Sequence, residues 1–196
     1  MRHLPALFLC ARDCCRSVAV MQLDPFDEAP LHREIVPHSA VYGEIFLQLR
    51  AHVQSSLQHV ELIHIGSTAI ADLRGKPMLD FVAITNRADL RAEQKEFERI
   101  GFHRRNVWVD RDDKPYMCAS VKQDERTFNI NIHICHRNDP VHRESIAFMQ
   151  ILNRRPDLRR KYEAAKDRAH LADPVNPEIY NREKEAVIRQ IQEQIG

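Results

Sequence analysis

ELIHIGSTAIADLRGKPMLDFVAI (residues Glu61–Ile84) decides the fold, because two apolar runs flank one short polar loop. VELIHI before the loop is typical of a short strand, and MLDFVAI after it of a largely buried strand. The chain has only five glycines, and two of them, Gly66 and Gly75, lie in this loop. A single carboxylate, Asp80, interrupts the second apolar run. The loop and Asp80 are therefore the first candidates for function.

The flanking sequence predicts further helices and strands. Apolar residues four apart predict a helix over 40–57, and a second helix over 88–101 ends at Gly101. FHRRNVWV (102–109) and KPYMCASVK (114–122) are interpreted as two strands joined by the turn DRDD. TFNINIHIC (127–135) alternates strictly, which predicts a strand with one apolar and one polar face. Three helices are predicted after residue 138, over 144–155, 156–171 and 176–196.

This order of elements predicts an α+β (mixed α/β) fold, in which helices flank a small mixed sheet. Residues 23–138 form the expected core, and residues 139–196 form a helical segment packed on it. Residues 1–22 are expected to be a disordered or leader extension, because they lack periodicity.

Composition excludes several classes of protein. The content of hydrophobic residues (43%) and charged residues (29%) is typical of a globular protein. The net charge of +1 favours neither nucleic acid nor a membrane surface as partner. Five cysteines without a regular framework indicate reduced thiols, so a cytoplasmic protein is expected.

The loop has the residue types of a phosphate site. Gly66 allows close approach of a ligand, and the hydroxyls of Ser67 and Thr68 can donate to a phosphate. Arg74 and Lys76 add positive charge, and Asp80 offers an oxygen ligand to Mg²⁺ or Mn²⁺. The alternative is an ordinary turn, with Asp80 paired structurally to Arg74 or Lys76.

The same residues resemble a known family. HIGSTAIADLRGKPMLDFVAI is similar to the HIGSTAVPGLAAKPIIDI stretch of the GrpB family. The resemblance extends over residues 35–196 through four further stretches, FERIGF, NINIHIC, IAFMQILNRRPDLRRKYEAAK and YNREK. The last two stretches each contain the spacing Tyr-x-x-x-Lys. The resemblance implies a nucleotidyltransferase-superfamily fold with a Gly-Ser loop at the active site.

Active members of that superfamily hold two metal ions with an Asp-x-Asp pair and a third carboxylate, and this chain departs from the pattern. Val82 stands where the second aspartate would be. Asn131 and His133 stand where the third carboxylate would lie. One aspartate and one histidine do not complete a two-metal clamp. His133 is therefore expected to act beside Asp80, as a metal ligand or general base.

Other groupings of side chains are weaker candidates. His64, His133, Cys135 and His136 could form a zinc site, but no paired ligand motif supports one. Ser67 with His64 as base lacks a nucleophile-elbow motif. One side of a basic helix carries Arg155, Arg159, Tyr162 and Lys166. This side could bind a phosphate tail or RNA. The alternative is that it faces solvent, with its charges in ion pairs. Trp108, near Arg104 and Arg105, could stack on a base or belong to the core.

The sequence thus predicts a GrpB-like protein that binds a nucleotide or related phosphate-containing small molecule, with metal-dependent nucleotidyl transfer as its candidate reaction. The alternative is an inactive binding module of the same fold that acts through its basic C-terminal helix. A membrane partner is not expected, and nucleic acid is not favoured. Asp80 and His133 are the candidate catalytic and metal-binding residues. The expected phosphate contacts are Gly66, Ser67, Thr68, Arg74, Lys76, Tyr162 and Lys166.

Overall fold

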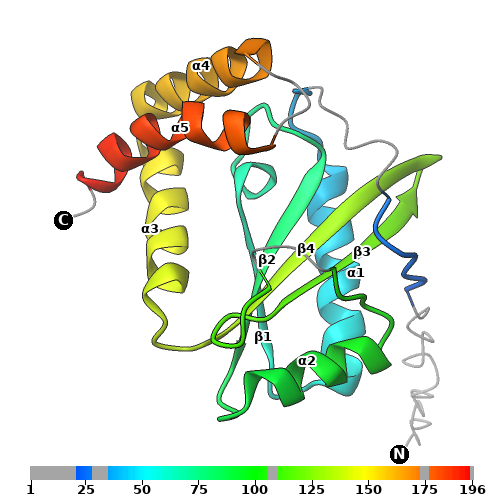
Figure 1. Ribbon diagram of the computed structural model, residues 1–196. Coiled ribbons are helices and arrows are strands. Elements are labelled where there is room, and N and C mark those ends of the chain that lie inside the picture. The colour runs from blue at the N-terminus through cyan, green and yellow to red at the C-terminus, as the bar shows by residue number, and fades with distance from the viewer. Residues whose placement is uncertain (1–20, 28–34, 106–109, 173–176, 195–196) are drawn as a thin grey trace, which may run out of the picture.

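The computed structural model describes residues 21–27, 35–105, 110–172 and 177–194, and in this part of the chain helices surround one four-stranded sheet (Figure 1). The strands are β1 (Glu61–Ile65), β2 (Met78–Thr85), β3 (Tyr116–Gln123) and β4 (Arg126–His136). The helices are α1 (Val41–Ser56), α2 (Leu90–Arg99), α3 (Pro140–Arg154), α4 (Pro156–Ala172) and α5 (Pro177–Gln192), with a 3-10 turn η1 (Ser67–Ala69) after β1. The predicted α+β fold is confirmed.

The sheet has the order β1-β2-β4-β3 and mixed strand directions. β2 is antiparallel to β1 and parallel to β4, and β3 is antiparallel to β4. In the β2–β4 register Asp80 lies beside Asn131, and Val82 lies beside His133. Paired residues share a face and side chains alternate, so these four side chains project from the same side of the sheet.

The opposite face of the sheet forms the main core. The apolar residues of the alternating strand, Phe128, Ile130, Ile132 and Ile134, are at most 4% exposed. They pack with buried residues of α1 and α2, including Ile45, Leu49 and Phe97. α1 has the predicted four-residue repeat of apolar side chains, which explains why it covers this face.

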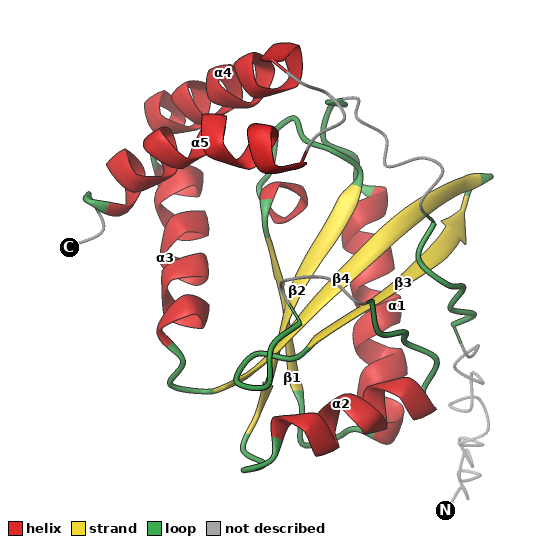
Figure 2. Cartoon of the chain, in the orientation of Figure 1, coloured by secondary structure: helices red, strands yellow, loops and turns green. Residues whose placement is uncertain are grey.

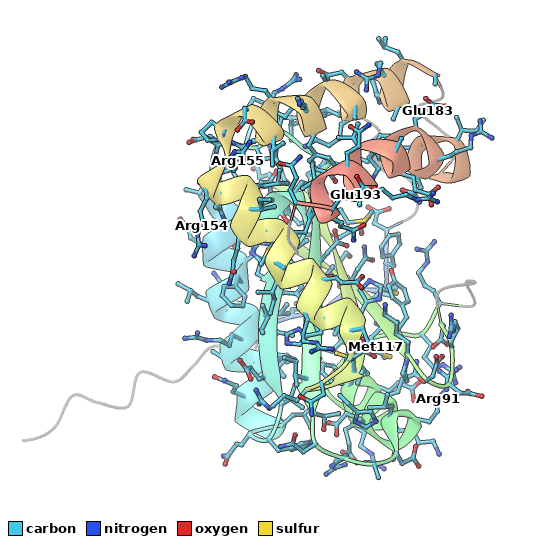
Figure 3. All side chains as sticks on the ribbon, turned by 90° about the vertical axis from the view of Figure 1, so that its left-hand side faces the viewer. Arg91, Met117, Arg154, Arg155, Glu183 and Glu193 are labelled. Atoms are coloured by element: carbon cyan, nitrogen blue, oxygen red, sulfur yellow. The ribbon has the colours of Figure 1, made fainter. Side chains whose placement is uncertain are left out.

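The C-terminal helices cover the polar face in part (Figure 2). Met149 of α3 packs against Ile65, Val82, Ile84 and Cys135 of the sheet. Ile70 and Leu73, from the loop after η1, pack into a cluster with Leu152, Leu158 and Ile191 of the three helices. In the side view, α4 leads away from the end of α3 near Arg154 and Arg155, and α5 runs back below α4 toward Glu193 (Figure 3). The Gly-Ser loop is therefore enclosed between the sheet and these helices.

One predicted strand is wrong within the described residues. Of FHRRNVWV, His103 makes only an isolated bridge to Cys118, and residues 106–109, including Trp108, lie outside the described part of the chain. Phe102 instead enters the core, with its ring centroid 5.4 Å from that of Phe97. The hairpin partner of β3 is β4, through a turn in which Asp124 and Glu125 have positive φ (49° and 60°), a backbone shape that suits tight hairpins.

The described chain begins with a segment that lies against the core. Met21 and Leu23 pack against the main core cluster. Asp24 exchanges two backbone hydrogen bonds with Ser120 of β3, at 2.9 and 2.8 Å. The predicted boundary between leader and core, after residue 22, therefore falls inside a packed segment.

Candidate phosphate-binding site

Both loop glycines are required by close packing. Gly66 has φ 75° and ψ −169°, and a Cβ there would lie 2.8 Å from Asp80 Oδ2. A Cβ on Gly75 would lie 2.4 Å from Ser67 Oγ and 3.8 Å from Lys166 Nζ. The loop thus brings its backbone against Asp80, Ser67 and Lys166 at once, which a larger residue at either position would prevent.

Asp80 is half-buried and is held by an amide. Asn131 Nδ2 donates to Asp80 Oδ1 at 2.8 Å, and the Tyr116 hydroxyl donates to Asn131 Oδ1. Burial raises the pKa of Asp80, while the Asn131 hydrogen bond and the charge of Lys184 lower it. The expectation that Arg74 is its ion-pair partner is not supported, because Arg74 binds Asp167 of α4 at 2.5 Å.

Lys166 of α4 is buried beneath the loop. It is 2% exposed, and its ammonium group donates to the carbonyl of Arg74. Its Nζ also lies 5.1 Å from the ring centroid of Tyr162. Burial lowers the pKa of Lys166 to about 8, although Glu163 nearby raises it. A cation in this position supports a site for negative charge.

Two further lysines share one aromatic ring. Lys76 Nζ lies 4.0 Å from the ring centroid of Tyr180, and Lys184 Nζ lies 4.3 Å from the same centroid. Burial lowers the pKa of Lys184 to about 8, Asp80 raises it, and Lys76 lowers it. We refer to Lys76, Lys166 and Lys184 as the lysine cluster.

The sequence reasoning did not assign Tyr180 and Lys184 to the site. The signal that could have found them is the repeated spacing Tyr-x-x-x-Lys at 162–166 and 180–184. In both helices this spacing places the lysine over the tyrosine ring, at 5.1 and 4.3 Å.

Thr68 and His64 face away from the lysine cluster. Thr68 is 3% exposed, and its hydroxyl donates to the Met78 carbonyl at 3.3 Å, so the hydroxyl is engaged within the fold. His64 Nε2 lies 2.9 Å from Thr68 Oγ1, and its ring stacks on Phe81 of the core face at 4.9 Å. His64 is thus on the opposite face from His133. The alternative that joined His64 to His133 in a zinc site is therefore wrong, and the ring nitrogen Nε2 of His64 is engaged with Thr68.

His133 lies on the face of Asp80 but opens into a separate cavity of about 90 Å³. Ser67 and Asp80 do not line that cavity, whereas His142 and Lys114 do. The Nδ1 atoms of His133 and His142 are buried and have no hydrogen-bond partner. Burial lowers the pKa of His133 to about 4, so its imidazole is neutral at pH 7. Asp80 and His133 therefore share a face of the sheet, but Ser67, Asp80 and His133 do not meet in this cavity.

The donor set around Asp80 does not fit a two-metal clamp. Within the described residues, no three His, Cys, Asp or Glu side chains are grouped closely enough to hold a metal ion. Val82 is apolar and 3% exposed, and Asn131 presents its NH₂ group to Asp80. Mg²⁺ takes oxygen ligands in a near-octahedral arrangement, which one carboxylate beside three lysines does not supply.

The basic side of α4 is not one continuous exposed surface. Arg155 pairs with Asp157 at 2.8 Å, and Arg159 donates to the Ala71 carbonyl at 2.8 Å. Tyr162 and Lys166 turn inward to the loop, at 8% and 2% exposure. The basic side of the helix predicted from the sequence thus has two parts. Its arginines Arg155 and Arg159 are engaged at the surface, and Tyr162 and Lys166 face the loop, where Lys166 belongs to the lysine cluster.

The fold and its site define a mixed α+β protein with a Gly-Ser loop, one sheet carboxylate and lysines from two C-terminal helices. The family model described as GrpB protein matches residues 32–194. The chain therefore belongs to the GrpB family. The described helices do not combine the length and apolar character needed to cross a membrane.

Solved structures were also compared with the chain. The crystal structure of conserved protein GrpB from Enterococcus faecalis has a TM-score of 0.65 and 22% identity, and covers 83% of this chain and 96% of that chain. A cytoplasmic RNA terminal U-transferase has a TM-score of 0.41 and 18% identity, covering 66% of this chain and 39% of that one. The Cid1 poly(U) polymerase, with Mg and 3′-dATP bound, has a TM-score of 0.43 and 15% identity, and the match covers 66% of this chain and 41% of that one. The comparison with curated proteins found no match.

Proposed function

We propose that this GrpB-family protein binds a nucleotide or related phosphate-containing small molecule between the Gly-Ser loop and helices α4 and α5. The observation that carries the proposal is the placement of Lys76 and Lys184 over one tyrosine ring, at 4.0 and 4.3 Å. These distances place the two ammonium groups no more than roughly 8 Å apart, where like charges repel by about 2 kcal/mol or more at an effective dielectric of about 20. A bound anion would remove this repulsion.

The neighbouring groups suit a phosphate. Lys166 adds a third ammonium group beneath the loop, 3.8 Å from the position of a Cβ on Gly75. Ser67 is partly exposed and has a hydroxyl that can donate to a phosphate oxygen. The aromatic rings of Tyr162 and Tyr180 hold the lysine side chains in place. The proposal is one of binding, because nucleotidyl transfer by the superfamily's two-metal chemistry needs carboxylates that Val82 and Asn131 do not provide.

The alternative, a binding module that grips RNA or another partner through the basic helix, has less support. Its outer arginines are engaged with Asp157 and with the Ala71 carbonyl. Its inner residues Tyr162 and Lys166 are buried and unavailable to a large partner. The arrangement favours a small ligand that enters beside the loop.

A thermal-shift panel of nucleotides, nucleoside monophosphates and coenzyme A precursors tests the proposal, since a ligand that binds only the folded state raises its melting temperature. We expect at least one phosphate compound to stabilise the wild type and to lose this effect in Lys184→Met. Lys161→Met is the matched control, because Lys161 is an exposed lysine of α4. A panel without any stabilising compound, or equal losses in both variants, would refute the proposal.

A further inference from the structure

The cavity beside His133 lies between the polar face of the sheet and the start of α3, which follows β4 after a short loop (Figure 1). Its apolar wall comes from Ile65, Val82 and Cys135 of the three strands β1, β2 and β4. The side chains of His142 and Ser145, from the first two turns of α3, line it from the other side. The cavity therefore joins one apolar wall to a group of polar side chains, as small-molecule sites do.

Two imidazole nitrogens of this cavity lack a partner within the protein. The Nδ1 atoms of His133 and His142 are buried without a hydrogen bond, and His142 is only 8% exposed. Buried polar atoms in folded proteins almost always have a partner, so both nitrogens require one that enters the cavity. Among the described residues, His170 of α4 has the third such nitrogen, but it does not line the cavity. The convergence of two such atoms, and not one alone, defines the site.

The protonation state of the two histidines favours a hydroxyl group as their partner. Burial lowers the pKa of His133 to about 4 and also lowers that of His142, so both rings are neutral at pH 7. A neutral imidazole nitrogen donates in one tautomer and accepts in the other. A hydroxyl group can do both, and it therefore suits either tautomer. Lys114 and Asp139 line the same cavity with opposite charges, which does not single out an ion of either sign.

The size of the cavity limits the group that it can enclose. A cavity of about 150 Å³ can hold benzene, with its six carbons, so about 90 Å³ suits a group of about four non-hydrogen atoms. A vicinal diol consists of two carbons and two hydroxyl oxygens. Its carbons suit the apolar wall, and its hydroxyls suit the two imidazoles. Lys114, Asp139 and Ser145 are half-buried, so the rest of a larger molecule can extend to solvent on their side.

We propose that this cavity binds the vicinal diol of a sugar or small polyol, with hydroxyl contacts to Nδ1 of His133 and of His142. The diol provides the partners that the protein itself does not supply to these nitrogens. A nucleoside ribose and a free polyol such as glycerol both present this group. The inference goes beyond the proposed phosphate site, because no member of the lysine cluster lines the cavity.

Nuclear magnetic resonance on the intact protein, with ¹⁵N-labelled histidines, tests the inference, because imidazole nitrogen shifts report the tautomer and hydrogen bonds of each ring. Adenosine and glycerol carry a vicinal diol, and 2′-deoxyadenosine and 1,3-propanediol are their counterparts without one. The signals of His133 and His142 should shift with a diol. Each counterpart should bind about fivefold more weakly, since one hydrogen bond is lost. Shifts with adenosine alone would assign the diol to a nucleoside, and shifts with glycerol alone to a free polyol.

A pair of variants separates the cavity from the rest of the protein. His142→Phe keeps a ring and removes Nδ1, so the diol affinity should fall by about fivefold or more. Its melting temperature should stay within a few degrees of the wild type, because the lost nitrogen has no partner in the fold. His170→Phe is the matched control, because it removes the same kind of nitrogen outside the cavity, and it should leave diol binding unchanged.

Several results would overturn the inference. Equal affinities for a diol and its counterpart, or equal losses in the two variants, would do so. A shift of the two histidines with acetate and with neither diol would assign the cavity to an anion instead, and no shift with any probe would leave it to water. The paired ligands are compared on the wild type, so the test holds even if His142→Phe does not fold. The phosphate proposal is tested separately, through Lys184.

Discussion

At the scale of single residues, Gly66 links the backbone of the loop to Asp80. Its φ and ψ of 75° and −169° fall in a region that only glycine adopts readily. A methyl group there would also meet Asp80 Oδ2 at 2.8 Å. We expect Gly66→Ala to destabilise the fold by about 1–3 kcal/mol from backbone strain alone, and to weaken phosphate binding. Urea unfolding measures the first effect, and calorimetry the second.

Gly43 provides the control for this substitution. It lies in α1, and a Cβ there would have no atom within 4 Å. Gly43→Ala should stabilise the fold by up to about 1 kcal/mol, because alanine favours the helix over glycine. Equal effects of the two substitutions would show that the loop tolerates a side chain at Gly66.

His64 is expected to make the fold sensitive to acid. Burial, and next the charge of His38, lower its pKa from 6.5 to about 4, so the folded chain keeps His64 neutral where the unfolded chain protonates it. Its contribution is therefore fully present above pH 6.5 and is lost as the pH falls toward 4. The wild type should lose stability over this interval.

His64→Phe isolates this effect, because a phenyl ring can keep the stack with Phe46 and Phe81. At pH 7 the variant should be less stable by about 1 kcal/mol, since the hydrogen bond to Thr68 is lost. The difference between the two proteins should shrink or reverse as the pH falls toward 4. Urea unfolding at several pH values checks this, and a constant difference would contradict the assignment.

At the scale of elements, α4 and α5 share one arrangement, in which a tyrosine is followed four residues later by a lysine whose ammonium group lies over the tyrosine ring. Burial lowers the pKa of Lys166 and of Lys184 to about 8 in each case. Both lysines are charged below this pH and neutral above it. The two helices therefore control how much positive charge faces the loop.

Phosphate binding should consequently weaken as the pH rises through about 8, by up to tenfold per pH unit for each lysine that loses its proton. The phosphate group of AMP, a monoester with a second pKa of about 6, is already mostly a dianion at pH 7, so it adds no opposing trend. Calorimetry with AMP between pH 7 and pH 9.5 measures the slope. Lys184→Met should reduce the slope, and an unchanged affinity up to pH 9.5 would argue against a role for these lysines.

At the scale of the whole molecule, the segment before α1 closes the edge of the sheet. Asn129 Nδ2 donates to the Asp27 carbonyl at 3.0 Å, and Ser120 Oγ donates to the Pro25 carbonyl at 2.8 Å. Leu23 packs against the main core cluster beside Gly101, where an added Cβ would lie 3.6 Å from the Leu23 side chain. These contacts join β3, β4 and the end of α2 to a stretch that the sequence assigned in part to a leader.

A chain shortened to begin at Met21 should melt within a few degrees of the full chain, because residues 1–20 carry no apolar periodicity. A chain shortened to begin at Glu28 loses the contacts of Leu23, Asp24 and Asp27. It should melt about 5–10 °C lower, since each kcal/mol corresponds to about 2–4 °C in a domain of this size. Calorimetric melts compare the three chains, and equal melting temperatures would show that the segment is dispensable.

The sequence by itself determined the elements and the two faces of the sheet. Strict alternation in β4 separates Ile130 and Ile132 from Asn131 and His133 whatever the rest of the chain does, because side chains of a strand alternate between faces. Apolar spacing in α1 and the two loop glycines are local signals of the same kind. The α+β fold followed from these local signals, and the family followed from the resemblance of the loop motif HIGSTAIADLRGKP to that of the GrpB family.

Only the tertiary structure decided which side chains meet at the site. Asp80 is influenced by Lys184 and not by the nearby Arg74, because the docking of α5 brings together residues far apart in the chain. His64 faces away from His133 because the register of β1 on β2 sets it opposite Phe81. FHRRNVWV has the composition of a strand, yet Phe102 packs into the core instead. Such choices depend on burial and register between distant elements, which local periodicity does not contain.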